Sequence, residues 1–313
     1  QNAFPGKGLR QLFLKGKRMH KFLRAAGFGA LLTETDVYEF LRDKVIRPEN
    51  LHTVIENAEG SKEAEYLLSV GKDIGIAADT ITYPDGTGQI RYYYPFFCAR
   101  DYSSEENCGL ERHTEQETFA GLIDEYKLGI SLIFYIQFSL EYKKYLRLNP
   151  PSDFKGTSLT AFANEGVVLL PVTKAGEADE SFAMRKNEEE RLLEAAMQGD
   201  QDAIETLTAS DMHLYNEAAD RIKTEDLYSV VEQSLMPSGI ECDQYSIIGE
   251  IMSVEEAVNN VTGEELWQLS LVCNGVSLKL CMRKEDLLGE PLCGRRVKAR
   301  IWLLGNLDLR RPV

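Results

Sequence analysis

The stretch that decides the fold is Leu266–Met282, LWQLSLVCNGVSLKLCM. Asn274-Gly275 divides it into two apolar runs, and this dipeptide is the strongest short signal of a type I′ turn, which needs positive φ at both central residues. In the second run, apolar residues alternate with Ser277 and Lys279, as in a strand with one buried face. The stretch therefore predicts an antiparallel hairpin.

The flanking sequence extends this hairpin into a small barrel. Residues 245–252 predict a strand before it, residues 284–288 predict a helical turn after it, and residues 297–304 predict a returning strand. A short fifth strand is predicted at 305–309. Three consecutive strands, a helical connection and a returning strand are the order of a small OB-like barrel, and an SH3-like barrel gives a similar order. We therefore expect an OB-like or SH3-like β-barrel over residues 243–313.

Residues 19–174 predict an α+β domain, in which helices precede an antiparallel sheet. Short turns between consecutive strands indicate antiparallel pairing, and helices gathered before the strands indicate α+β. The predicted elements are a helix ended by Gly27, a helix capped at Thr33-Glu34-Thr35-Asp36, a helix over 63–70, strands over 74–78 and 89–98, a hairpin of 111–123 with 130–138, a helix over 139–146, and a hairpin of 157–163 with 167–172 around Asn164-Glu165-Gly166.

The middle of the chain is acidic. Residues 175–242 hold 17 acidic and five basic residues, whereas the whole chain has a formal net charge of −15. Capping residues and apolar spacing predict helices in this segment, and a polar stretch over 173–187 predicts a linker before them. We therefore expect a central acidic helical segment, whose charge repels nucleic acid and anionic membrane surfaces.

The first 18 residues carry five basic residues and no acidic one, and the ordered pattern begins at Met19. They lack the apolar core and cleavage site of a signal peptide. We interpret residues 1–18 as a leader that is non-native or disordered, and we expect it to be dispensable. No apolar run in the chain reaches the roughly 18 residues of a membrane span.

Six cysteines occur at positions 98, 108, 242, 273, 281 and 293, and no two have the spacing C-x-x-C. Several fall inside apolar strand patterns, which suits reduced thiols of a cytoplasmic protein better than a disulfide framework. The paired spacing of a structural zinc site is missing as well. We expect no metal and no cofactor.

One strand pattern gathers potential catalytic groups. Glu111, His113, Glu115 and Glu117 have a spacing of two, so on a strand they share one face. Carboxylates with an imidazole can bind a divalent cation or supply an acid–base pair, and His113 and Glu115 are the catalytic candidates. However, antiparallel sheets commonly have one solvated face, and Glu111 lies about 20 Å from Glu117 at the usual rise. We expect a solvated strand face that holds no metal.

A second strand pattern is basic. Arg296, Lys298, Arg300 and Trp302 alternate along the returning strand, so they share one face and form a candidate binding surface. Small barrels often bind single-stranded nucleic acid through a basic groove and stacked aromatic rings. Aromatic residues are few here, and the net charge of −15 opposes phosphate. We therefore expect this face to meet acidic protein surface, in this chain or in a partner, and we disfavour nucleic acid.

From Met19 onward the chain resembles an uncharacterised bacterial family of proteins of about 300 residues, a domain of unknown function found in Gram-positive anaerobes. The segments that carry the resemblance are MHKFLRAAGF at 19–28, GISLIFY at 129–135, ECDQY at 241–245 and RIWLLG at 300–305. The resemblance implies a bacterial, cytoplasmic protein. It implies no activity and no site residues.

No recognisable catalytic motif occurs in the sequence: P-loop, G-x-S-x-G and H-E-x-x-H spacings are all missing. The leading hypothesis is a non-enzymatic protein-binding or regulatory module, in which the barrel and the acidic helices contact protein and no membrane. The first alternative is an OB-type single-stranded nucleic-acid binder. The second is an enzyme whose site is assembled in space within the N-terminal domain.

Overall fold

The computed structural model divides the chain into two compact units, residues 1–169 together with 233–313, and residues 170–232. The predicted ranges 19–174 and 243–313 thus contribute to one unit. The residues that the structure describes are 12–14, 20–99, 101, 103–113, 118–125, 130–148, 153–172, 191, 192, 195, 196, 198–209, 212, 231–239 and 242–307.

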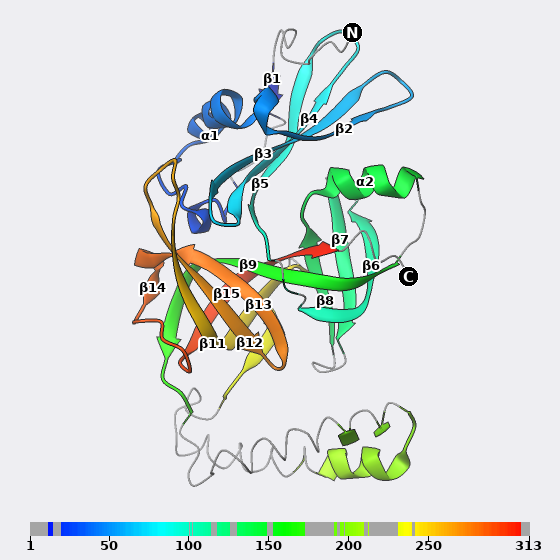
Figure 1. The fold of residues 1–313 in the computed structure, drawn as a ribbon, viewed down its shortest axis with the longest axis vertical. Helices are drawn as coiled ribbons and strands as arrows, with labels where there is room; N and C mark the ends of the chain where they lie inside the picture. The colour runs from blue at the N-terminus through cyan, green and yellow to red at the C-terminus, as the bar shows by residue number, and fades with distance from the viewer. Residues whose placement is uncertain are drawn as a thin grey trace. The chain divides into compact units, whose positions relative to one another are not determined.

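A five-stranded sheet, with strand order β1-β5-β4-β3-β2, begins the larger unit, and we refer to it as the N-terminal sheet (Figure 1). Strands β2 to β5 are antiparallel neighbours, whereas β1 runs parallel to β5. Three residues of the leader, in β1, thus pair with this sheet. The strands are β1 (Leu12–Leu14), β2 (Leu51–Glu56), β3 (Lys62–Gly71), β4 (Ile74–Thr82) and β5 (Gly88–Phe97).

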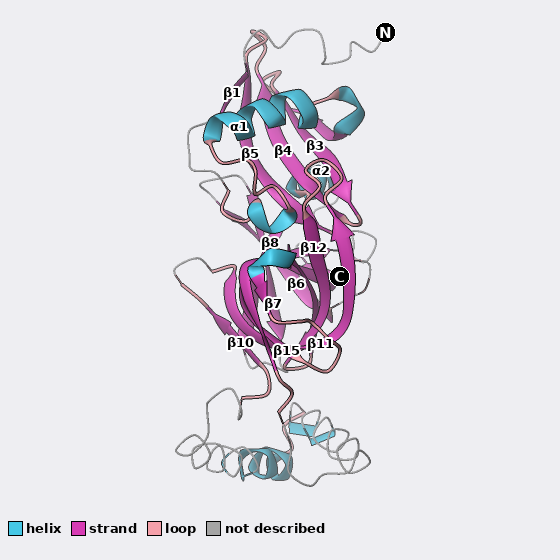
Figure 2. Cartoon of the chain, turned by 90° about the vertical axis from the view of Figure 1, so that its left-hand side faces the viewer, coloured by secondary structure: helices cyan, strands magenta, loops and turns pink. Residues whose placement is uncertain are grey.

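Helices lie on both faces of the N-terminal sheet, with α1 on one side and α2 on the other (Figures 1 and 2). Gly27 ends the first helical turn with a φ of 80°, and Thr33 and Asp36 form a reciprocal capping box at α1, so both predicted helix boundaries are confirmed. The helical elements are η1 (Arg24–Ala26), α1 (Glu34–Phe40), η2 (Leu41–Val45), η3 (Pro48–Asn50) and α2 (Ser139–Leu148).

The helix predicted over residues 63–70 is wrong, because this segment is the strand β3. Its apolar residues fit a helical spacing as well as a strand, and short apolar runs are ambiguous in this way. Pairing with β2 on one side and β4 on the other decides for the strand. This difference matters for function, because Glu63 and Glu65 lie on the same face of the sheet when the segment is a strand.

The remaining strands of the larger unit form one sheet, part of which closes into a five-stranded barrel. The ring runs β9–β15–β11–β12–β13 and returns to β9, with a parallel closure and antiparallel pairs elsewhere. Asn274 and Gly275 have φ of 48° and 82°, which confirms the predicted turn. The barrel strands are β9 (Asp153–Leu169), β11 (Gln244–Val258), β12 (Glu265–Cys273), β13 (Val276–Arg283) and β15 (Arg296–Leu307). Shorter elements are β10 (Ser234–Pro237), η4 (Lys284–Asp286) and β14 (Leu287–Leu288).

The strand that closes the barrel comes from the first predicted domain. The hairpin predicted over 157–172 is wrong, because β9 is one continuous strand that pairs with β15 up to Leu169. The turn signal at Asn164-Glu165-Gly166 marks a shift of register against β15 instead of a reversal of the chain. The separate fifth strand predicted at 305–309 is also wrong, since β15 itself continues to Leu307.

Three further strands lie beside the barrel and complete the sheet. β7 pairs antiparallel with β8, which confirms the predicted pairing with 130–138. The single strand predicted over 111–123 is wrong, because residues 111–113 end β6 and residues 118–123 belong to β7, and these two strands pair with each other. β8 pairs with β15, and β6 pairs with β9, so the two long barrel strands also hold this group. Their bounds are β6 (Ser104–His113), β7 (Thr118–Glu125) and β8 (Ile130–Ile136).

Buried polar side chains join the N-terminal sheet to the barrel. Gln137 is fully buried, and its side chain makes a strand-like pair of hydrogen bonds with the backbone of Phe97, at 2.8 and 2.9 Å. Asn259 is fully buried too, and its Nδ2 donates to the carbonyls of Ala26 and Gly27 at the end of η1. These bonds hold the N-terminal sheet and the barrel together within the larger unit.

The smaller unit is described over part of its length. Residues 201–209 are helical, and Asp200 Oδ1 accepts the backbone N–H groups of Asp202 and Ala203 at the start of this helix. The other helices predicted between residues 175 and 242 fall largely outside the described residues.

The six cysteines are free thiols, and Cys242 and Cys293 are exposed. Burial raises the pKa of Cys98 to about 11 and that of Cys273 to about 12, which keeps both protonated. Within the described part of the chain, every helix is too short or too polar to cross a membrane.

Candidate functional site

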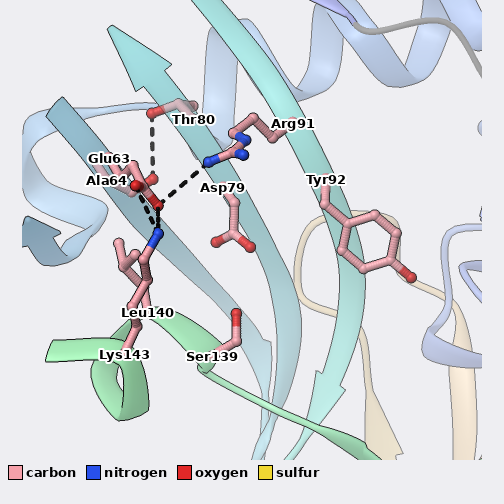
Figure 3. Close-up of a pocket in the computed structure, with 9 residues that line it drawn as sticks. All are labelled: Glu63, Ala64, Asp79, Thr80, Arg91, Tyr92, Ser139, Leu140 and Lys143. Atoms are coloured by element: carbon pink, nitrogen blue, oxygen red, sulfur yellow. Dashed lines mark hydrogen bonds and ion pairs between the residues drawn. The ribbon is translucent and has the colours of Figure 1, made fainter. Parts of the chain in front are cut away.

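A small polar pocket opens between the N-terminal sheet and the start of α2 (Figure 3). Its enclosed space is about 20 Å³, which is room for one water molecule or an ion of similar size. We refer to it as the acidic pocket. Its lining residues are Glu63, Ala64, Asp79, Thr80, Arg91, Tyr92, Ser139, Leu140 and Lys143.

Strand register brings the acidic side chains of the pocket onto one face. Glu65 on β3 lies directly opposite Asp79 on β4, and Asp79 lies opposite Tyr92 on β5. Opposite residues of antiparallel strands point to the same side, so all three side chains share the face that α2 covers. Glu63, two residues before Glu65, shares this face as well and binds Lys143 of α2.

Glu63 is a fully partnered carboxylate. Lys143 Nζ lies 2.7 Å from both of its oxygens, Asn57 Nδ2 donates to Oε1 at 2.9 Å, and Arg91 Nη1 lies 3.4 Å from Oε2. Burial opposes ionisation of Glu63, but the hydrogen bonds from Lys143 and Asn57 outweigh it, so the pKa of Glu63 is lowered. Glu63 therefore remains ionised and holds both cations of the pocket.

Glu65 and Asp79 form the opposite case: Glu65 is buried, and Asp79 is half-buried with its Oδ1 atom buried. Both oxygens of Glu65, which is 0 % exposed, and Oδ1 of Asp79 are buried without a well-placed hydrogen-bond donor among the described residues, and the two carboxyls lie close enough to share a proton. Burial, followed by repulsion from Asp79, raises the pKa of Glu65 well above its ordinary value, against the nearby backbone N–H of Leu140. Burial also raises the pKa of Asp79 to about 7, against the attraction of Arg91. Near neutral pH the pair thus retains a proton on Glu65.

Two irregular backbone positions shape the pocket. A β-bulge in β5 leaves Arg91 unopposed between Ile90, which faces Thr80, and Tyr92, which faces Asp79. Bulges re-aim side chains and are common beside active sites. Phe138, immediately before α2, has a φ of 58°, a strained value for a bulky residue, and its N–H donates to Tyr94 Oη at 2.8 Å. Strain of this kind concentrates at functional sites.

A chain of aromatic rings leads from the pocket toward the barrel. Tyr92 stacks on Tyr94 with a centroid separation of 5.8 Å, Tyr135 contacts both, and Trp302 of β15 lies 5.3 Å from Tyr135. The hydroxyl of Tyr135 is buried and has no hydrogen-bond partner among the described residues. His20 packs at 4.6 Å from Trp302, and burial lowers the pKa of His20 to about 3, so this imidazole is neutral.

The predicted catalytic residues are not among the described residues that line this pocket. Glu111 and His113 lie on β6, opposite Ala120 and Thr118 of β7, and their side chains fall outside the described residues. Glu115 and Glu117 fall outside the described residues altogether. Among the residues that are described, no three or more His, Cys, Asp or Glu side chains are grouped so that they could hold a metal ion.

The predicted basic face of β15 is only partly exposed. Arg296 is 4 % exposed and Lys298 is half-buried, whereas Arg300 is exposed. Trp302 is 3 % exposed, and its Nε1 donates to Asp243 Oδ2 at 2.7 Å. In this structure Trp302 is therefore unavailable for stacking on a nucleic-acid base.

Sequence reasoning missed Asp79, which lines the pocket, and Glu65, its neighbour across the strand pair. A usable signal was present for Glu63 and Glu65, because two acids at spacing two inside an apolar strand would have placed both on one face. Interpreting residues 63–70 as a helix removed that signal. Asp79 stands in the run Ala77-Ala78-Asp79-Thr80-Ile81, where a buried carboxyl is uncommon.

The fold and the site define a mixed α+β protein in which a helix-covered sheet, carrying a buried carboxyl pair, adjoins a five-stranded barrel. The chain belongs to the family described as "Domain of unknown function, E. rectale Gene description (DUF3881)", whose model matches residues 23–305. This match confirms the resemblance noted from the sequence. Comparisons with curated proteins and with solved structures find no match.

Proposed function

We propose that this is a non-enzymatic binding and regulatory protein whose ligand site is the acidic pocket. The observation that supports this proposal is that Asp79, which lines the pocket, has a buried Oδ1 without a partner, and that both oxygens of its cross-strand neighbour Glu65 are likewise buried without partners. An unpartnered polar atom in the interior destabilises the fold, and a buried charge does so more strongly. Residues with strongly perturbed pKa values beside a specific charge partner in a cleft are typical of functional sites.

The size of the pocket supports binding over catalysis. A carboxyl pair that shares a proton is also the arrangement of acid–base enzymes, so an enzyme is the second candidate function. However, the space of about 20 Å³ beside Asp79 favours a small ligand over an organic substrate. A water-sized ligand fits this space, and its binding can act on α2, which supplies Ser139, Leu140 and Lys143 to the lining.

We propose that the barrel is of the OB-like or SH3-like kind and that it makes protein contacts in the cytoplasm. The strand order β11–β12–β13, the turn η4 and the returning β15 support the barrel class. The burial of Trp302 weakens the nucleic-acid alternative. Arg300, which is exposed, and the −12 charge of residues 175–242 support an acidic protein surface as the partner. Six free thiols support the cytoplasm.

The site assignment is tested by comparing Asp79→Asn with Glu63→Gln in urea unfolding at pH 8. Asp79→Asn replaces a buried charge with a neutral isostere, so we expect a higher urea midpoint, because residues kept for function are commonly unfavourable for stability. Glu63→Gln removes the partner of Lys143 and should lower the midpoint. If Asp79→Asn lowered the midpoint as well, the carboxyl of Asp79 would be a structural group, and the site proposal would fail.

A further inference from the structure

The edge of β5 holds a chain segment from outside the part of the chain that the family model matches. β1 lies at one edge of the N-terminal sheet and pairs there with β5 (Figure 2). The two strands are parallel, and the register is Leu12 with Gly88, Phe13 with Gln89 and Leu14 with Ile90. The family model begins at residue 23, so β5 belongs to the matched part of the chain and β1 does not. The edge of β5 thus accepts an extended segment that the matched part does not supply.

The backbone of β5 presents hydrogen-bonding groups toward this edge. At the turn between β4 and β5, the N–H of Tyr83 donates to the carbonyl of Thr87 at 2.9 Å, so these two residues form a hydrogen-bonded pair. Such pairs alternate along antiparallel strands. The register therefore turns the peptide groups of Gln89 toward β4 and those of Gly88 and Ile90 away from β4. In an added parallel strand, the residue opposite Gln89 can bond to both Gly88 and Ile90.

β1 is a short strand that a competing segment can replace. It has three residues, and Phe13 holds the position opposite Gln89. Two isolated strands are marginally stable in water, and the first residues of a domain are ordered only where other parts of the structure hold them. β4 pairs with β5 along its other side, so β1 can leave without unfolding β5.

Charge favours a basic segment at this edge. Residues 1–18 carry five basic residues and no acidic one, and because the whole chain carries −15, residues 19–313 carry −20. Asp85, in the turn before β5, is exposed, and hydrogen bonds from Thr87 lower its pKa, so it is ionised at neutral pH. Opposite charges speed association. A segment that fits this edge therefore has a short apolar run with basic neighbours, as Leu12–Leu14 has in Arg10 and Lys15.

We propose that the edge of β5 at Gly88–Ile90 binds a basic, extended segment of a protein partner, which adds to the N-terminal sheet as a parallel strand and displaces β1. Addition of a strand to a sheet edge is a common mode of peptide recognition, in which main-chain hydrogen bonds supply the affinity. In the free chain β1 covers this edge, and as a tethered segment it competes at an effective concentration of about millimolar. β1 thus inhibits binding of the partner. The inference concerns a surface other than the acidic pocket and does not depend on a ligand there.

The test measures binding of a fluorescently labelled peptide with the sequence of residues 9–18, LRQLFLKGKR, by fluorescence anisotropy. The acceptor is the full chain with Phe13→Pro, which removes the N–H of β1 opposite Gln89 and leaves β5 unchanged. We expect saturable binding to this variant and binding at least about ten-fold weaker to the wild-type chain, where the tethered β1 competes. The matched control, Phe4→Pro, makes the same substitution outside β1 and should behave as the wild type.

Two further measurements separate strand addition from attraction between charges. A peptide that is N-methylated at the position of Phe13 keeps every side chain and charge but lacks one main-chain N–H, so we expect it to bind at least about ten-fold more weakly. Amide hydrogen exchange locates the site: the amide of Ile90 should exchange faster in Phe13→Pro than in the wild type, and the added peptide should protect it again.

Three results would overturn the proposal. The first is the absence of saturable peptide binding to a Phe13→Pro chain that unfolds cooperatively, or equal binding of the N-methylated peptide. The second is a Phe13→Pro chain that fails to fold, because β1 would then be a structural strand. The third is a concentration-dependent dimer of the wild-type chain that Phe13→Pro abolishes, because the occupant of the edge would then be a second copy of this chain.

Discussion

Two strand regions of this protein carry charged residues at alternating positions, and the side chains of the two regions differ in burial and in hydrogen-bond partners. On β3 and β4, both oxygens of Glu65 and Oδ1 of Asp79 are buried without a well-placed partner. On β15, Trp302 is also buried, but its Nε1 donates to Asp243, and Arg300 stays exposed. Buried polar groups are nearly always hydrogen-bonded, so the exceptions ask for an explanation. Trp302 of β15 therefore serves the structure, whereas we propose that the carboxyl pair serves ligand binding.

The largest expected effect tests the structural half of this comparison. Trp302→Ala should lower the free energy of unfolding by about 3–5 kcal/mol, the usual cost of removing a large buried aromatic side chain. Trp302→Phe keeps the ring contacts with Phe22 and Tyr135 but loses the bond to Asp243, so its loss should be clearly smaller. Urea unfolding measures both losses. A loss below about 1 kcal/mol for the alanine variant would contradict a structural role and make Trp302 a candidate binding residue again.

The next effect has the opposite sign. At pH 8, Asp79→Asn should raise the free energy of unfolding by roughly 1–3 kcal/mol. Each unit of difference between the folded and unfolded pKa corresponds to about 1.4 kcal/mol, and partial relaxation of the surroundings reduces the total. The pKa of Asp79 is about 7 when folded and near 3.8 when unfolded. The folded state therefore binds more protons between these values, and wild-type stability falls as pH rises from about 4 to 7. The variant should lack this contribution, and the two proteins should converge below pH 4.

Glu63→Gln sharpens the contrast between partnered and unpartnered carboxyls. It should lower the free energy of unfolding by about 2 kcal/mol, because Lys143 and Arg91 lose their shared anion in a mostly buried place. Glu56→Gln is the matched control, since its pair with Lys62 is exposed and exposed pairs contribute about 0–1 kcal/mol. Equal losses of unfolding free energy in Glu63→Gln and Glu56→Gln would show that the ion pairs of the pocket contribute no more than an exposed pair.

The smallest effect is expected on the exposed part of the basic face. Arg300→Ala should change the free energy of unfolding by less than about 0.5 kcal/mol. Fluorescence anisotropy with labelled single-stranded DNA and RNA at about 150 mM salt should show no saturable binding below roughly 10 μM, because too few rings are available to stack bases. Tighter binding that Arg300→Ala weakened would favour the nucleic-acid alternative.

Elements defined by local chemistry were predictable from the sequence. The turn at Asn274-Gly275 and the end of η1 at Gly27 depend on backbone conformations that few residues adopt. The capping box at Thr33 and Asp36 is likewise a contact across three residues. These signals act within one turn of the chain, so no distant partner is needed to interpret them.

The pocket was not predictable, because its parts meet only through long-range pairing. Whether Glu65 is solvated or buried depends on α2, which follows it in the chain by a long interval, and on its register with Asp79. The continuous strand β9 was not predicted for a similar reason. The residues Asn164–Gly166 are typical of a turn, and only the pairing of β9 with β15 makes them an irregularity within a strand. Alternation gives the face of a side chain, whereas burial is decided by whatever covers that face.

The central claim is that Glu65 and Asp79 hold a proton where ordinary carboxyls have none. Carbon-detected NMR of the side-chain carboxyl carbons, titrated between pH 3 and 10 and assigned with Asp79→Asn and Glu65→Gln, measures this directly. We predict a pKa of about 7 for Asp79 and a clearly higher pKa for Glu65 in the folded protein. Values near the ordinary 3.9 and 4.3 for both groups would contradict the account, because the pair would then be ionised and satisfied at neutral pH.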